Sequence, residues 1–198
     1  MKKIMFNDKY GLTRAVLEGR KTMTRRIVPE SIFRIAQMES NLHDIIIADC
    51  IKEHTPLLFT DVVAIAQSYK ELADVDDFYD CEQAKRQAGW GNKMFVKAEL
   101  MPHRIRITGI KVERLQDITN EDAMREGVFR YDKPPFHHED DMYAPWPPYI
   151  KPYVYDADNL KYFCEARYAF KYLINKVCGW DTWINNPFVF VYEFELIQ

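Results

Sequence analysis

The stretch Gly19-Arg20-Lys21-Thr22-Met23-Thr24-Arg25-Arg26 places four cations and two hydroxyls within eight residues. The segment before it carries apolar side chains at helical spacing, with Asn7 or Asp8 as a candidate N-cap and Gly19 at a position typical of a helix end. We therefore predict a helix near residues 9–18, a turn of the backbone at Gly19, and a strand over residues 24–28.

This basic stretch is compatible with three interpretations. Lys21 close to Thr24 could build a nucleophile, because burial or neighbouring cations lower a lysine pKa and the neutral amine can accept the hydroxyl proton. Arg20, Arg25 and Arg26 could supply that electrostatic pressure, or they could bind the phosphate of a nucleic acid. A solvated basic turn without a function is the third interpretation.

Further along the chain, the hydrophobic pattern predicts alternating helices and strands. Pro29 suits the first turn of a helix that continues to about Met38. The apolar run 45–51 favours a buried strand, and a second strand is expected within 60–66. Residues 158–178 carry the pattern of a long amphipathic helix, and residues 188–197 that of a closing strand with Phe188, Phe190, Tyr192 and Phe194 on one face.

Residues 104–115 indicate a strand that bends. Ile105 and Ile107 alternate on one parity, whereas Ile110 and Val112 alternate on the other, with Gly109 between them. A period of two that changes phase at a glycine is typical of a β-bulge, and bulges bend strands where a sheet closes into a barrel. We therefore predict a barrel with a bulge at Gly109.

Two later segments are candidates for a site. Residues 119–127 begin with a plausible cap and end in glycine, which predicts a short helix with Glu126 in its last turn, where a carboxylate opposes the helix dipole. The segment 129–155 is rich in proline and aromatic residues, among them Trp146, and we interpret it as an ordered lid or platform. Its aromatic rings could stack on a base or cover the flank of a barrel.

Composition restricts the class of protein. The 198 residues and a hydrophobic fraction of 47% suit one domain, and a net charge of −3 excludes a global cationic field of the kind that non-specific nucleic-acid binders use. No apolar run is long enough to span a membrane, so we expect a soluble cytoplasmic protein that does not act on membranes. We predict no cofactor and no metal: the four cysteines form no C-x-x-C pair, and the adjacent His137 and His138 have no partner spacing elsewhere.

Several blocks together resemble the ASCH domain, a β-barrel family related to the PUA RNA-binding fold, in the larger form found in phage and prophage regions. The helix and the pattern Gly-x-Lys-x-x-x-x-Arg, filled by Gly19, Lys21 and Arg26, match the family signature. The further blocks are Met101-Pro102, Val112-Glu113-Arg114-Leu115-Gln116-Asp117-Ile118 and Asn186-Pro187-Phe188-Val189-Phe190-Val191-Tyr192-Glu193-Phe194. The resemblance implies an α+β fold over residues 1–198, a PUA-like, mixed but mostly antiparallel barrel with flanking helices and an insertion at about 129–155.

The resemblance also implies two functions. Small family members hydrolyse the amide of 4-N-acetylcytidine with a Lys, a Thr and a Glu, which correspond here to Lys21, Thr24 and Glu126. The other function is binding of RNA, a nucleotide or a modified nucleoside in a cleft without chemistry, with Gly19, Arg20, Arg25, Arg26 and Trp146 as candidate binding residues. We expect binding ahead of hydrolysis, because Ala66 and Gln67 stand where relatives carry an Arg-Glu pair. A structural role in a phage, and any oligomeric state, stay open.

Overall fold

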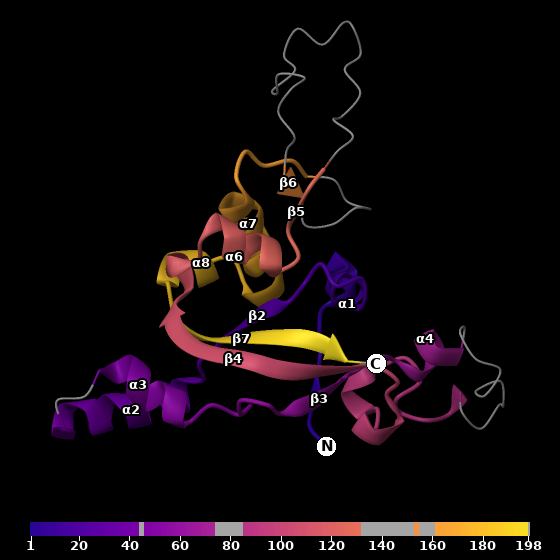
Figure 1. Cartoon of the computed structure of the whole chain (residues 1–198), viewed down its shortest axis with the longest axis horizontal. Helices are drawn as coiled ribbons and strands as arrows, with labels where there is room; N and C mark the ends of the chain where they lie inside the picture. Colours follow the sequence, from indigo (N-terminus) through magenta and orange to yellow (C-terminus); the bar gives the residue numbers. More distant parts are fainter. Residues whose placement is uncertain (44–45, 74–84, 132–152, 155–160, 198) are drawn as a thin grey trace, which may run out of the picture.

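The computed structural model describes residues 1–43, 46–73, 85–131, 153–154 and 161–197. Its centre is a five-stranded sheet in the order β1-β3-β4-β7-β2 (Figure 1). β1 runs parallel to β3 and the other neighbours are antiparallel. The strands are β1 (Lys3–Ile4), β2 (Met23–Ile27), β3 (Val62–Ile65), β4 (Arg104–Arg114) and β7 (Phe188–Ile197), and a separate pair joins β5 (Phe129–Arg130) to β6 (Tyr153–Val154). The predicted α+β class with a mixed, mostly antiparallel sheet is confirmed.

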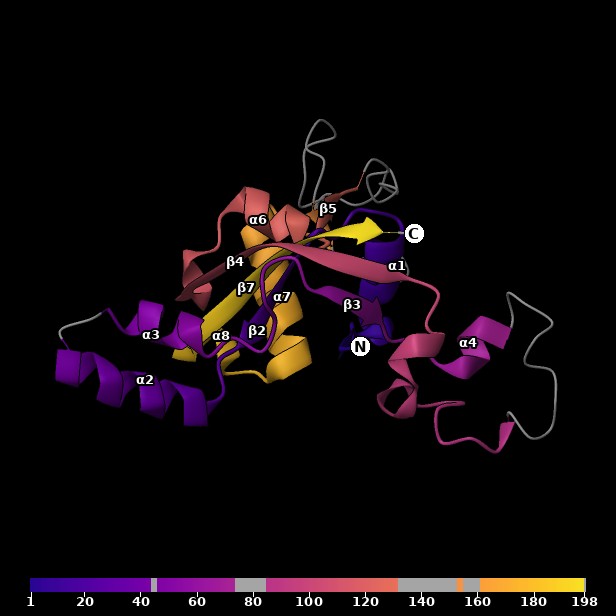
Figure 2. The same ribbon diagram turned by 60° about the horizontal axis from the view of Figure 1, so that its bottom comes forward.

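Helices surround this sheet. One group lies together on one side of it, a helical pair projects at one end, and a further helix lies near the opposite end (Figures 1 and 2). The group is α6 (Asn120–Arg125), α7 (Ala166–Cys178) and α8 (Thr182–Asn185), the pair is α2 (Glu30–His43) and α3 (Ile47–Glu53), and the helix near the opposite end is α4 (Tyr69–Ala73). α1 (Leu12–Leu17) follows the single-turn η1 (Asp8–Tyr10), and further short turns are η3 (Lys93–Phe95), η4 (Ala98–Leu100) and η5 (Leu115–Asp117). None of the helices described is long and apolar enough to cross a bilayer.

The strand β7 is an interior strand of the sheet, between β4 and β2, rather than its closing edge. It pairs with β4 along its whole length and with β2 over residues 189–193, so in this half its backbone is hydrogen-bonded on both sides. Both parities are buried: Val189 and Val191 have no exposed surface, and Phe190 and Tyr192 are 1% exposed. The strand predicted over residues 188–197 is confirmed. The alternating aromatic side chains mark only one of its faces, whereas both faces are buried.

The bulge at Gly109 is confirmed. Ile107 pairs with Phe194, and the next pair along the ladder is Gly109 with Glu193, so Thr108 is the extra residue on β4. A Cβ at Gly109 would lie 3.3 Å from the Glu193 side chain, which explains why the smallest residue stands there. β4 can therefore bend without losing its pairing with β7.

The prediction of a closed barrel is wrong for the part of the chain that the structure describes. Closure would need a backbone ladder between the edge strands β1 and β2, but β1 ends at Ile4 and the chain leaves it for η1. Across this seam the Arg26 guanidinium, rather than a backbone amide, donates to the Met5 carbonyl at 2.5 Å. The sheet stays open along the seam between Met5 and Arg26.

Two predicted elements differ in kind or extent. The apolar run 45–51 is not a strand, because α3 begins at Ile47 and buries Cys50 and Ile51 on one face. Short apolar runs fit either period, and Asp49 in the first turn favours the helix. The long C-terminal helix begins at Ala166, after Glu165, rather than near residue 158.

The lid prediction for 129–155 falls mostly outside the residues described, which include only Phe129 to Tyr131 and the strand β6 from this segment. Trp146 lies outside them. The root of the segment does contact the basic stretch, because the Arg20 guanidinium lies 4.9 Å from the centre of the Phe129 ring. Whether the rest of the segment forms a lid stays a prediction.

Candidate functional site

The basic stretch turns as predicted after α1. Gly19 adopts a left-handed φ of 73°, and its amide donates to the Val16 carbonyl at 2.9 Å. The amide of Lys21 then reaches back to the Ala15 carbonyl, also at 2.9 Å, before β2 begins at Met23. Gly19 therefore sets the direction of the chain and leaves the Lys21 side chain pointing inward.

Lys21 is fully engaged inside the protein. Its side chain is 2% exposed, and the ammonium donates to the Glu126 carboxylate at 2.6 Å, the Glu126 carbonyl at 2.9 Å and the Met23 carbonyl at 2.8 Å. Burial lowers the pKa of Lys21, the Glu126 carboxylate opposes that shift, and the charges of Arg26 and Arg25 add to it. These contacts account for all three hydrogens of the ammonium.

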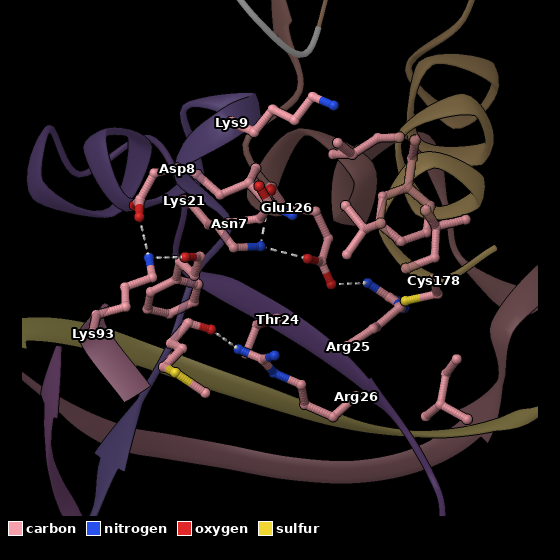
Figure 3. A pocket seen from close by; sticks show the side chains of 18 residues that line it. Asn7, Asp8, Lys9, Lys21, Thr24, Arg25, Arg26, Lys93, Glu126 and Cys178 are labelled. Atoms are coloured by element: carbon pink, nitrogen blue, oxygen red, sulfur yellow. Dashed lines mark hydrogen bonds and ion pairs between the residues drawn. The ribbon is translucent and has the colours of Figure 1, made fainter. Parts of the chain in front are cut away.

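Glu126 reaches this position from the C-terminal end of α6. The predicted short helix is confirmed: Thr119 caps it by accepting the Asp122 amide at 3.1 Å, and Gly127 ends it with a φ of 105°. A buried carboxylate at the negative end of a helix dipole is unfavourable by itself. Two cations offset this cost, because Lys21 binds one carboxylate oxygen and Arg25 the other (Figure 3).

Arg25 connects Glu126 to two further carboxylates. Its guanidinium lies 3.1 Å from Glu126, 2.6 Å from Glu113 and 2.8 Å from Asp122. Burial alone would lower the pKa of Arg25, but the three carboxylates raise it overall. Burial raises and Arg25 lowers the pKa of Asp122, with a net lowering. Lys111 completes the cluster through Glu113 at 3.0 Å and Asp122 at 3.3 Å.

We call these six side chains the inner network: Lys21, Arg25, Lys111, Glu113, Asp122 and Glu126. Its three cations and three carboxylates balance in charge. Arg25 was predicted to bind a ligand, but its guanidinium is directed at the carboxylates of the protein. Its place in the structure is that of an anchor for Glu126.

The inner network borders a cavity of about 640 Å³ that opens along the seam between β1 and β2 (Figure 3). This volume lies in the range of small-molecule sites. α7 contributes an apolar wall, and η1 with the residues just before it contributes the opposite, more polar side. The lining residues are Met5, Phe6, Asn7, Asp8, Lys9, Leu12, Lys21, Thr24, Arg25, Arg26, Ile27, Lys93, Glu126, Phe170, Leu173, Ile174, Val177 and Cys178.

The three candidate catalytic residues do line one cavity, as predicted. Lys21, Thr24 and Glu126 are 2%, 4% and 3% exposed and come from the turn, from β2 and from the end of α6. No hydrogen bond joins the Thr24 hydroxyl to the Lys21 ammonium, whose hydrogens are taken by Met23 and Glu126. The expected direct contact between lysine and threonine is absent from this arrangement.

The polar side of the cavity was not found from the sequence. Lys93 in η3 pairs with Asp8 at 2.5 Å and also donates to the Phe6 carbonyl. Asp8 therefore does not cap α1, whose N-cap residue is Gly11. Instead it accepts the hydroxyl of Thr13. Lys93 lies 87 residues from Phe6 and in no recognisable motif, so only the fold reveals this pair.

The remaining candidates lie in different places. Arg26 lines the cavity, whereas Gly19 and Arg20 do not. Arg20 instead pairs with Glu18 at 2.6 Å and stacks over Phe129. The apolar wall of α7 matches the amphipathic pattern, which could have identified Phe170 and Leu173 as lining residues.

Within the residues that the structure describes, no group of three or more His, Cys, Asp or Glu side chains is arranged to hold a metal ion. The reactive groups that line the cavity are the hydroxyl of Thr24, the carboxylates of Asp8 and Glu126, the thiol of Cys178 and several cations. The chain matches no family model, no curated protein and no solved structure.

Proposed function

We propose that this protein is an ASCH-type domain that binds a nucleoside, free or as part of a nucleotide or RNA, in the cavity at the seam. The observation that supports the proposal most is the convergence of Lys21, Thr24 and Glu126 on one cavity, since these are the residues that the resemblance to the family singles out. An apolar wall opposite polar groups suits a planar base with a polar edge.

Calorimetric titration with cytidine and with 4-N-acetylcytidine tests this proposal. Val177 lines the cavity and is 38% exposed, so Val177→Trp should fill the cavity without disturbing the core. We expect it to weaken nucleoside binding by about tenfold or more, equivalent to roughly 1.4 kcal/mol. Tyr168→Trp, at an exposed site on the same helix but outside the cavity, is the matched control. Equal affinities for the two variants would contradict the proposal.

Amide hydrolysis is the second candidate function, and the placement of Thr24 favours it. The hydroxyl of Thr24 borders the cavity beside a lysine whose pKa is lowered by burial. In this mechanism the hydroxyl attacks the acyl carbon, Lys21 takes its proton, the amine leaves with a proton, and water hydrolyses the resulting ester. Lys21 would first have to lose one of its three protons, and with it one of its present hydrogen bonds, so that the neutral amine could accept the proton of Thr24.

Release of acetate from 4-N-acetylcytidine distinguishes hydrolysis from binding alone. Thr24→Val should abolish release while leaving nucleoside affinity within about threefold, because the attacking atom is lost and the shape is kept. Thr24→Ser should retain part of the activity. Thr22→Val is the matched control, since Thr22 lies outside the cavity. Wild-type protein that binds the nucleoside and releases no acetate would leave binding as the function.

A further inference from the structure

We propose that the cavity takes its nucleoside in phosphorylated form and that Arg26 binds the phosphate. The inference rests on the proposed function and names the charge of the ligand and the side chain that receives it. It follows from a comparison of the cations in and beside the cavity: most of them already have an anionic partner, and Arg26 has none among the residues that the structure describes.

The other strong candidates are occupied. Lys21 and Arg25 belong to the inner network, in which cations and carboxylates balance. Lys93 is paired with Asp8. Arg20 is paired with Glu18 and lies outside the cavity.

Arg26 differs from these cations. No carboxylate among the described residues forms an ion pair with it. Its guanidinium donates to the Met5 carbonyl at 2.5 Å and lies 5.8 Å from the centre of the Phe6 ring. A guanidinium carries five N–H donors in a planar fork that fits a phosphate in a bidentate manner, so most of its donors remain for a ligand.

The electrostatic surroundings favour an anion at this place. Desolvation by the surrounding protein lowers the pKa of Arg26, an effect that the Glu126 carboxylate opposes, although the side chain is still accessible from solvent. Arginine stays charged despite such a shift, and a partly desolvated cation without a partner gains from an incoming anion. Lys9, which also lines the cavity and has no carboxylate partner among the described residues, adds to the positive potential.

The rest of the cavity limits what else the ligand can be. The wall formed by Phe170, Leu173, Ile174 and Val177 offers an apolar surface to a base, while Arg26 lies on the edge strand β2. A ligand that contacts both the apolar wall and the Arg26 guanidinium favourably has an apolar planar part and one strongly anionic group. A phosphate ester of a nucleoside, with a charge of about −1.5 to −2 as a monoester, has this combination.

The test compares cytidine with cytidine 5′-monophosphate by calorimetry at low salt. Wild-type protein should bind the monophosphate about tenfold or more tightly than cytidine, as a charge-assisted bidentate contact predicts. Arg26→Gln should remove this preference, because it should weaken binding of the monophosphate about tenfold more than binding of cytidine, and Arg26→Lys should keep part of the preference. Arg20→Gln, the matched control in the same basic stretch, should keep all of it.

The outcomes separate the two proposals. Equal affinities for cytidine and its monophosphate, or a preference that survives Arg26→Gln, would overturn the phosphate site while nucleoside binding stands. Failure of both ligands to bind would overturn both. A 5′-phosphorylated oligonucleotide that binds more tightly than the mononucleotide, with the same dependence on Arg26, would identify the end of a nucleic acid as the source of the phosphate.

Discussion

The inner end of the cavity and its open end use charge in opposite ways. At the inner end, Lys21, Arg25 and Glu126 are nearly inaccessible, and each carboxylate oxygen of Glu126 has its own cation. At the open end, the Asp8 side chain is 41% exposed in its pair with Lys93, and Arg26 has a backbone carbonyl as its hydrogen-bond partner. The cavity thus has a fixed, balanced base and an incompletely balanced opening.

This difference shows why neighbours in sequence have different roles. Arg25 and Arg26 are adjacent on β2, and successive side chains of a strand point to opposite sides. Arg25 therefore meets the carboxylates of β4 and α6, whereas Arg26 faces the seam that β1 leaves open. A basic stretch that looks uniform in composition is divided by the strand into structural and available cations.

The largest expected effect is the loss of stability when the inner network is broken. Lys21→Met removes one partner of a buried ion pair and should lower the free energy of unfolding by about 3–5 kcal/mol. Glu126→Gln should lower the free energy of unfolding by a similar amount. The double variant should lose less than the sum of the two single losses, because the two residues contact each other. Urea unfolding of the single and double variants measures these differences.

Lys93→Met is the matched variant at the open end of the cavity. Its ion-pair partner Asp8 is 41% exposed, so the loss should be about 1 kcal/mol or less. A loss from Lys93→Met as large as that from Lys21→Met would remove the distinction between the two ends. A loss below about 1 kcal/mol from Lys21→Met would contradict the inner network itself.

A smaller effect concerns acid stability. The pKa of Asp122 is lowered below its ordinary value of 3.8: burial raises it, but the hydrogen bond and charge of Arg25 outweigh burial. Near this pH the native state therefore binds fewer protons than the unfolded state. The stabilisation from ionised Asp122 is complete above about pH 4 and is lost as the pH falls through the lowered pKa. Asp122→Asn should flatten the fall of stability below about pH 4.

Urea unfolding as a function of pH measures this fall in the free energy of unfolding below about pH 4, which we call the acid limb. Glu121→Gln, at an exposed position on the same helix, is the control and should leave the limb unchanged. An acid limb of the same slope in Asp122→Asn and in the wild-type protein would show that the contact between Arg25 and Asp122 does not stabilise the fold.

Sequence reasoning succeeded where the signal is local. The left-handed turn at Gly19, the phase change at Gly109 and the capped helix before Gly127 each depend on a few consecutive residues. These features place Lys21, Thr24 and Glu126 near one another because they determine where the chain turns and which face of a strand is buried.

The failures come from contacts between distant residues. Arg25 meets Glu113 across 88 positions and Lys93 meets Phe6 across 87, and neither partner lies in a pattern that identifies the other. Barrel closure depends on whether β1 is long enough to pair with β2, which the bulge at Gly109 does not determine. The apolar spacing of residues 47–51 fits the period of a helix as well as that of a strand, so tertiary packing determines that they form a helix.

Methionine methyl groups allow the most direct test that the cavity at the seam is the ligand site. Met5 lines the cavity, whereas Met38 lies on α2 and Met101 in a separate apolar cluster with Tyr69 and Val96. In a ¹³C-methyl NMR titration with cytidine 5′-monophosphate, assigned by Met→Leu variants, we predict a saturable shift of Met5 with Met38 and Met101 unchanged. Shifts at Met38 or Met101 without one at Met5, or no saturable shift at all, would contradict the account.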